Sequence, residues 1–331
     1  MKLPMNRLHE RCHAAKRMSK TPLLITNDDG VNSVGIKELA SELHRKGHPI
    51  IVLAPLREQS ASGMKLTLRE DMSFNEHNEI ADEIRANDSV PLRVFSLDGS
   101  PCDCVIVSID GGLKSKIPEI SPELCISGIN RGPNLSVDVL HSGTVSAARE
   151  ASIYGMPSIA ASLATYSHQN YSQSVDATIS LVESICELLE KTPPNIGRPN
   201  GTGASLPNTP EIESVIRWFL DGNIFLNLNV PEEWNGKFKT VGLGARWYHN
   251  ASDMLDGKES GIAFEVGAAK IWDEDIPKTD CNAVNDGFAA ITPLETWPGN
   301  HPLGVPEGIL NIAMKEGEGG KPSWIQKPSN L

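Results

Sequence analysis

The stretch LLITNDDGVNSVGIKELASEL, residues 23–43, decides the fold class of this chain. It opens on the apolar run Leu23–Thr26, which predicts a short buried strand, and then passes through an acidic turn. Residues 35–47 show the helical spacing of apolar side chains and end in basic residues and a glycine, as helix C-termini do. A strand followed by a turn and a helix is the repeating unit of parallel sheets, so the stretch predicts an α/β fold.

The same alternation continues as far as residue 163. Apolar runs that predict strands occupy residues 50–55, 92–99, 123–130 and 157–163, with an acidic stretch at 69–89. Helices are predicted at 100–113 and 142–155, and Ser100 and Pro101 suit the N-cap and first position of the former. The pattern predicts a Rossmann-like, doubly wound, mostly parallel sheet with helices on both faces.

The second half of the chain has a different pattern, which predicts an antiparallel extension of the sheet. Residues 191–208 are rich in proline, glycine and asparagine and predict a loop. Strands without long helices between them are predicted at 225–231, 239–246 and 261–271, and residues 279–294 predict a helical turn and a last strand. The expected organisation is a disordered leader (1–20), a metal- and phosphate-binding core (21–190), an insertion (191–222), C-terminal strands that complete the same domain (223–310) and a flexible tail (311–331).

The composition argues against several classes of function. The 331 residues carry a net charge of −12 and no dense basic run with interleaved aromatic residues, which argues against a nucleic-acid partner. The 6 cysteines include no CxxC pair, so neither a zinc ribbon nor a disulfide framework is indicated, and a reducing cytoplasm is the expected setting. No apolar run approaches the roughly 18 residues that cross a membrane, so no membrane partner is expected.

The leader is basic but lacks the apolar segment of about 7 to 15 residues that a secretory signal requires. His9, Cys12 and His13 lie close together in it, but no second cluster of metal ligands accompanies them. Met18 lies just before the first predicted strand and is an alternative start of translation.

Polar side chains gather after the predicted strands. Ligands of open parallel sheets bind beyond the carboxyl ends of the strands, so residues at those positions form one edge. Asp28 and Asp29 follow the first strand. The polar residues that follow the other strands are Ser60, Ser62, Asn130, Asn134, Asp138, His141, Ser142 and Thr144.

These residue types suit a hard cation beside a phosphate. Two carboxylates with a hydroxyl and an amide oxygen are a ligand set that Mg²⁺, Mn²⁺ or Ca²⁺ prefers, and a cation would cancel the repulsion between Asp28 and Asp29. The backbone N–H groups and hydroxyls at 142–144 open a predicted helix and could hold a phosphate. Taken singly, each motif is explained by a turn, a loop or an N-cap, and only their shared edge favours a site.

The chain resembles the SurE family of 5'/3'-nucleotidases. The motifs NDDG (27–30), APLREQSASG (54–63), SGINRGPN (127–134), HSGTV (141–145) and FLNLNVP (225–231) occur in the family's order, and the resemblance spans about residues 22–294. It implies a three-layer αβα fold and hydrolysis of nucleoside 5'- and possibly 3'-monophosphates. It also implies one divalent cation per subunit, Mg²⁺ or Mn²⁺, and a homodimer or homotetramer.

The resemblance assigns residues to the site one by one. The implied metal ligands are Asp28, Asp29, Ser60 and Asn130, of which Asp28, Asp29 and Asn130 are also the implied catalytic residues. The implied phosphate-binding residues are Asn134, Ser142, Gly143 and Thr144. The chain departs from the usual pattern at Ser33-Val34, Ser136 and His141, where relatives usually have Ala-Pro, Gly and Tyr. These departures concern the choice of substrate rather than the metal ligands.

Two other interpretations compete with this one. Phosphatases of the haloacid dehalogenase type also use aspartates after a first strand, but theirs stand two apart, whereas Asp28 and Asp29 are adjacent. A non-catalytic nucleotide or polyphosphate binder on the same fold would keep the pocket without turnover. For a catalytic site, both a metal-activated water and Asp28 itself stay open as the nucleophile.

Overall fold

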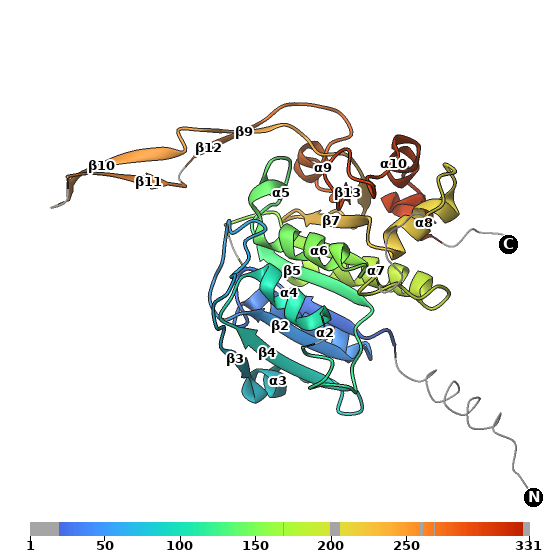
Figure 1. Cartoon of the computed structure of the whole chain (residues 1–331). Helices are drawn as coiled ribbons and strands as arrows, with labels where there is room; N and C mark the ends of the chain where they lie inside the picture. Colours follow the sequence, from blue (N-terminus) through green and yellow to red (C-terminus); the bar gives the residue numbers. More distant parts are fainter. Residues whose placement is uncertain are drawn as a thin grey trace, which may run out of the picture.

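A computed structural model describes residues 20–110, 112–167, 169–198, 206–258, 261–267 and 269–326. Its centre is a nine-stranded sheet (Figure 1). In spatial order the strands are β3 (Phe74–Glu76), β4 (Leu92–Leu97), β2 (Ile50–Pro55), β1 (Leu23–Thr26), β5 (Leu124–Arg131), β6 (Ser158–Leu163), β7 (Ile224–Val230), β13 (Ala289–Glu295) and β8 (Phe238–Thr240). Residues 1–19 of the predicted leader, with His9, Cys12, His13 and Met18, lie outside the described residues.

The predicted doubly wound sheet is confirmed. Strands β4, β2, β1, β5, β6 and β7 are parallel, whereas β13 runs antiparallel to β7, as expected for the C-terminal side. The chain adds β2 and β4 on one side of β1 and then returns to add β5 on the other side. The strand order therefore reverses between β1 and β5, and this switch point is where ligands bind in open α/β sheets.

Helices cover both faces of the sheet and make three layers. Alternate residues of β1 explain this, because Leu23 and Ile25 belong to one apolar core and Leu24 to another. The first core contains residues of α2 (Val34–Arg45), α3 (Asn78–Ile84), α7 (Ser172–Leu189), α8 (Ile212–Leu220) and α10 (Glu307–Ala313). The second contains residues of α4 (Pro101–Ile109) and α6 (Gly143–Ile153).

Local sequence sets where these helices begin and end. Ser100 is the N-cap of α4 and accepts a hydrogen bond from the Asp103 N–H, while the Asp103 carboxylate accepts one from the Ser100 N–H at 2.8 Å. Pro101 occupies the first helical position, as predicted. The last turn of α2 contains His44 and Arg45, and its C-cap is followed by Gly47 at φ +93°.

The acidic stretch 69–89 contains the edge strand β3 and the helix α3, neither of which was predicted from the sequence. All three residues of β3 are exposed, so the alternation that marks a half-buried strand is missing there.

An extended arm projects from the body between β8 and the short helix α9 (Asp280–Asn285) (Figure 1). It consists of two antiparallel pairs, β9 (Arg246–His249) with β12 (Lys270–Asp273) and β10 (Ser252–Lys258) with β11 (Gly261–Val266). The predicted strands at 239–246 and 261–271 correspond to parts of these ribbons and of β8. Large apolar side chains exposed on the arm are Trp247, Tyr248, Met254, Phe264, Val266, Ile271 and Trp272.

The insertion at 191–222 is not only a loop. It contains α8, and before it Arg198 reaches the C-terminal end of α6. Arg198 Nε donates to the Ile153 carbonyl at 2.7 Å and Nη2 to the Ser152 carbonyl at 2.9 Å. These carbonyls lie at the C-terminal end of the helix, where the Ser152 carbonyl also accepts the Gly155 N–H at 2.9 Å. The Arg198 guanidinium adds hydrogen bonds and a positive charge at this end of α6.

The C-terminal segment differs from the expected flexible tail. Helix α10 is followed by two short 3₁₀ turns, Glu318–Gly320 and Ser323–Ile325. Trp324 is 0% exposed, lies 5.1 Å from the ring of Phe219 in α8 and donates its indole N–H to the Ala313 carbonyl at 3.1 Å. One large aromatic side chain among polar residues and glycines gives no periodicity, which is why the sequence did not predict this packing.

No helix in the described parts of the chain combines the length and the apolar character that crossing a membrane requires.

A buried acid between α4 and α6 gives a pH-dependent prediction. Burial, and then the charge of Asp103, raise the pKa of Glu150 from 4.5 to about 6. The ionised form is therefore disfavoured in the folded state, and stability falls as the pH rises from 4.5 to 6 and stays lower above. We expect Glu150→Gln to gain stability relative to the wild type by up to about 2 kcal/mol at pH 8 and little at pH 4.5. Urea unfolding of both proteins across this range measures the difference, and a constant difference would contradict the prediction.

Candidate functional site

The predicted site lies beyond the carboxyl ends of β1 and β5. Asp28 and Asp29 follow β1 directly, and Asn130 is the next-to-last residue of β5. The N-terminus of α6 reaches the same place, since the Thr144 hydroxyl donates a hydrogen bond to Asp28 Oδ1. The Arg131 N–H donates to Asp29 Oδ2 at 3.1 Å and joins the end of β5 to the second acid. Strand topology thus brings together residues that are far apart in the sequence.

Asp28 is a buried carboxylate, with 3% of its surface exposed. Burial raises its pKa, and hydrogen bonds from the Thr144 side chain and from the Thr144 and Gly143 backbone oppose this. Residue 143 has to be a glycine, because a Cβ there would lie 2.7 Å from Asp28 Cβ and 2.9 Å from Asp28 Oδ2. The absence of a side chain at Gly143 therefore lets the first turn of α6 lie directly against Asp28.

Asp29 is less buried but is also perturbed. Burial, followed by the charge of Asp28, raises its pKa from 3.8 to about 7. Hydrogen bonding to the Arg131 N–H acts in the opposite direction. Two adjacent carboxylates with raised pKa values are the arrangement that a divalent cation relieves.

The loop after β2 is joined to the site by its backbone. The Gln59 N–H donates to the Asp28 carbonyl at 2.7 Å. The Ser60 hydroxyl, which the resemblance implies is a metal ligand, is exposed and donates to Glu58 Oε1 at 2.8 Å. The structure therefore brings the Ser60 backbone close to the acids but gives its hydroxyl another partner.

Ser62, two residues further on, has the more enclosed hydroxyl. Its Oγ is buried and finds no hydrogen-bond partner within the part of the chain that is described. It would lie 2.7 Å from a Cβ placed on Gly143, which puts it beside Asp28. The Gly63 N–H donates to the His141 carbonyl at 2.8 Å and fastens this turn to the start of α6.

Asn130 and Ser142 lie where the sequence predicted. The Asn130 side-chain NH₂ donates to the Gly132 carbonyl at 2.9 Å. The amide oxygen Oδ1 is the atom of this side chain that could bind a cation. Ser142 is the N-cap of α6, and its hydroxyl accepts a hydrogen bond from the Val145 N–H at 3.0 Å. The predicted helix start at 142 is confirmed.

Asn134 is a structural anchor of its loop. Its N–H donates to Asn229 Oδ1 at 2.8 Å, and its carbonyl accepts the side-chain amides of Asn227 and Asn229. Its own Nδ2 donates to Ser162 Oγ at 2.9 Å. Asn227 and Asn229 were not among the predicted site residues, although two asparagines within the apolar run FLNLNVP indicate buried amides that need hydrogen-bond partners.

The residues fit a hard divalent cation such as Mg²⁺ or Mn²⁺ better than a softer ion such as Zn²⁺ or Cu²⁺. No group of three or more histidine, cysteine or acidic side chains suited to a metal occurs among the residues that the structure covers. The candidate donors are instead two carboxylates, an amide oxygen and serine hydroxyls, with the orphaned Ser62 Oγ beside them. An all-oxygen set with few protein ligands is typical of Mg²⁺ or Mn²⁺ sites that keep bound waters.

The Thr144–Asp28 hydrogen bond gives a testable prediction. Thr144→Val keeps the shape of the buried side chain and removes its donor, so the pKa of Asp28 should rise and Mn²⁺ affinity should fall by about tenfold, as for other groups that orient metal ligands. Thr144→Ser retains the hydroxyl and is the matched control. Calorimetric titration of Mn²⁺ measures both affinities, and equal affinities would show that the bond does not support the acid.

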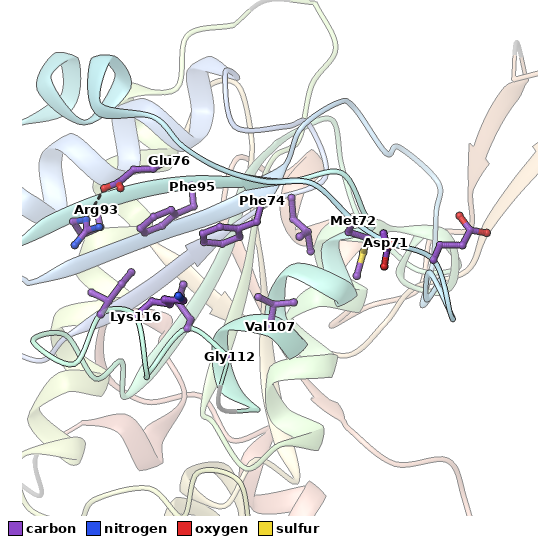
Figure 2. Close-up of a pocket in the computed structure, with 13 residues that line it drawn as sticks. Asp71, Met72, Phe74, Glu76, Arg93, Phe95, Val107, Gly112 and Lys116 are labelled. Atoms are coloured by element: carbon purple, nitrogen blue, oxygen red, sulfur yellow. Dashed lines mark hydrogen bonds and ion pairs between the residues drawn. The ribbon is translucent and has the colours of Figure 1, made fainter.

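A cavity of about 910 Å³ lies away from this site, between the β3–β4 edge and α4 (Figure 2). Its lining includes the stacked rings of Phe74 and Phe95, 4.9 Å apart, and Arg93, whose Nε donates to Glu76 at 2.7 Å. None of the residues implied for the metal or phosphate site lines it. Cavity size therefore does not identify the chemical site in this fold.

Comparisons with known proteins find relatives over most of the chain. The sequence profile of the family described as "Survival protein SurE" matches residues 23–252. The chain is 34% identical to a 5'-nucleotidase SurE of Syntrophotalea carbinolica, over 82% of this chain and 90% of that protein. It is 33% identical to the 5'-nucleotidase SurE of Desulforamulus reducens, over 82% and 91%. The crystal structure of a SurE protein from Aquifex aeolicus superposes with a TM-score of 0.59 at 27% identity, covering 84% of this chain and 95% of that one.

Proposed function

The chain belongs to the SurE family, and from that premise we propose that it is a metal-dependent phosphomonoesterase that hydrolyses nucleoside monophosphates to nucleoside and phosphate. Nucleotidases of this family depend on metals in general, and relatives that match most of the chain are named 5'-nucleotidases. The observation that carries the proposal is the placement of Asp28 against the first turn of α6 and of Asp29 against the end of β5, at the switch point of the sheet.

Asp28, Asp29 and Asn130 would hold one Mg²⁺ or Mn²⁺ ion. Ser60 would join them if its hydroxyl left Glu58, an exposed hydrogen bond worth about 1 kcal/mol. When bound, such an ion polarises the phosphoryl group and lowers the pKa of a coordinated water. The two acids have raised pKa values without it, which supports a role in binding positive charge.

The start of α6 would bind the phosphate. Ser142 caps the helix, and the backbone N–H groups of Gly143 and Thr144, which here hydrogen-bond to Asp28, lie at its positive end. They would turn to the phosphate once a cation holds that carboxylate. The same groups would stabilise the negative charge on the phosphoryl oxygens as the leaving oxygen departs. Asn134 supports this site as the anchor of the loop, since its backbone and Nδ2 are already hydrogen-bonded.

Phosphate release from a panel of nucleoside 5'- and 3'-monophosphates with Mg²⁺ or Mn²⁺ tests the proposal. We expect turnover with both metals, none after removal of metal by EDTA, and recovery on adding it back. Binding of nucleotide without any phosphate release would favour the alternative, a non-catalytic binder on the same fold, which the names of the relatives do not favour.

A homodimer or homotetramer in the cytoplasm completes the proposal. The exposed apolar side chains of the arm, such as Trp247 and Trp272, support contacts between copies because a lone chain leaves them in water. Sedimentation analysis of the full chain measures the oligomeric state.

A further inference from the structure

The base of the arm is joined to the phosphate-binding turn by a buried ion-pair network. Arg246 in β9 is 7% exposed, and its Nη1 donates to Asp138 Oδ2 at 2.9 Å. Its Nε and Nη2 donate to the two carboxylate oxygens of Asp273 in β12 at 2.8 and 2.9 Å. The Tyr248 hydroxyl donates to the other oxygen of Asp138. One guanidinium thus connects both strands at the arm's base to a residue of the body.

Asp138 in turn contacts the residue at which α6 begins. It is the first residue of the short helix α5 (Asp138–His141), which ends directly before the N-cap Ser142. The Asp138 carbonyl accepts the Ser142 N–H at 2.9 Å, and its side chain accepts the Leu135 N–H at 3.1 Å. A shift of Asp138 therefore moves both ends of the loop that leads into the phosphate-binding turn.

Ser136 makes a second connection. It adopts φ +51°, a conformation that favours glycine. Its hydroxyl donates to the Gly244 carbonyl at 2.8 Å and accepts the Arg246 N–H at 2.9 Å. Its N–H donates to Asp280 at 2.9 Å, and Asp280 also accepts the Gly244 N–H at 2.7 Å.

We propose that Arg246 is a positioning residue for the phosphate-binding turn at 142–144, acting through Asp138. This inference rests on the proposed function. It gives the arm a role in substrate binding, because the Arg246 guanidinium in the arm holds Asp138 and, through it, the turn at 142–144 in place. The hydrogen bonds of Arg246 go to Ser136, Asp138 and Asp273, and none reaches Asp28 or Asp29. The network should therefore affect phosphate binding more than metal binding.

The test compares Arg246→Met, Arg246→Lys and the control Arg93→Met in the full-length protein. Arg93 also pairs with two acids, Glu76 and Glu119, but lies in β4, next to the edge strand β3 and at the other end of the sheet from β8. For Arg246→Met we expect the KM for nucleotide and the inhibition constant of inorganic phosphate to rise about tenfold, as when a binding group is displaced by a fraction of an ångström. Mn²⁺ affinity should change by less than about twofold, Arg246→Lys should recover part of the loss, and Arg93→Met should change neither constant.

Unchanged KM and phosphate inhibition in folded Arg246→Met would overturn the inference, as would equal losses of phosphate and Mn²⁺ binding. If Arg246→Met does not fold, Tyr248→Phe and Ser136→Gly decide, because each removes hydrogen bonds and no charge. Both should weaken inhibition by phosphate, and no change in either would overturn the inference. If the wild type releases no phosphate from any nucleotide, the proposed function fails, while titration with inorganic phosphate still decides the role of Arg246.

Discussion

Asp29→Asn is expected to lose most phosphate release and to bind Mn²⁺ much more weakly than the wild type. The substitution keeps the shape of the side chain but removes one anionic oxygen ligand. The folded wild type should be stabilised by metal, by about 2.7 kcal/mol at a hundredfold excess over Kd, and the variant should lose most of this gain. Phosphate release and melting temperatures with and without Mn²⁺ measure both effects.

Without metal, in EDTA, the wild type should no longer be more stable than Asp29→Asn. The pKa of Asp29 in the folded protein is raised from 3.8 to about 7, so its ionisation destabilises the metal-free fold as the pH rises through this range. Asp29→Asn removes that effect and should melt no lower than the wild type in EDTA at pH 8. Asp71→Asn, at an exposed acid away from the site, is the control and should change neither activity nor metal dependence. Full turnover by Asp29→Asn at ordinary metal concentrations would refute the metal site.

Trp324→Ala should produce the largest loss of stability, about 3 to 5 kcal/mol, because it removes a fully buried aromatic side chain and leaves a cavity. Trp272→Ala on the arm is the matched control, since Trp272 is 55% exposed and its removal should cost the single chain little. Urea unfolding at one protein concentration compares the two. If both variants lose the same amount, the segment after α10 does not contribute to the core.

The sequence predicted the sheet well where the chain follows strong local rules. Strands β1 and β2 are almost entirely apolar and buried, and Ser100 and Ser142 are N-caps with side-chain hydrogen bonds. It failed where structure depends on distant partners. The arm divides the predicted strands into two ribbons whose mostly exposed residues show no alternation of buried and exposed side chains. Helix α8 was missed although Val215, Trp218 and Phe219 recur at helical spacing, a signal that the proline- and glycine-rich segment before it obscured.

At the predicted site, the positions of the residues could be predicted from the sequence, but their side-chain contacts could not. Asp28, Asp29, Asn130 and the start of α6 share one edge because strand ends converge, and that rule needs no knowledge of side-chain contacts. The rule cannot tell which hydroxyl is engaged, so it did not foresee the bond between Ser60 and Glu58.

Nor could the rule reveal Arg246, whose partner Asp138 lies 108 positions earlier in the sequence. Nothing near Arg246 in the sequence marks it as buried. Side-chain contacts of this kind become visible only when the fold is known.

The capping of α6 by Arg198 bears on how this chain can be altered by protein engineering. Exposed loops of small and polar residues are usually the segments that tolerate removal. Here such a loop supplies a guanidinium at one end of the helix whose other end contacts Asp28. Deleting the loop would leave the Ile153 carbonyl without its Arg198 donor, whereas the Ser152 carbonyl would keep the Gly155 N–H. A shortened chain therefore needs a new donor at this end of α6.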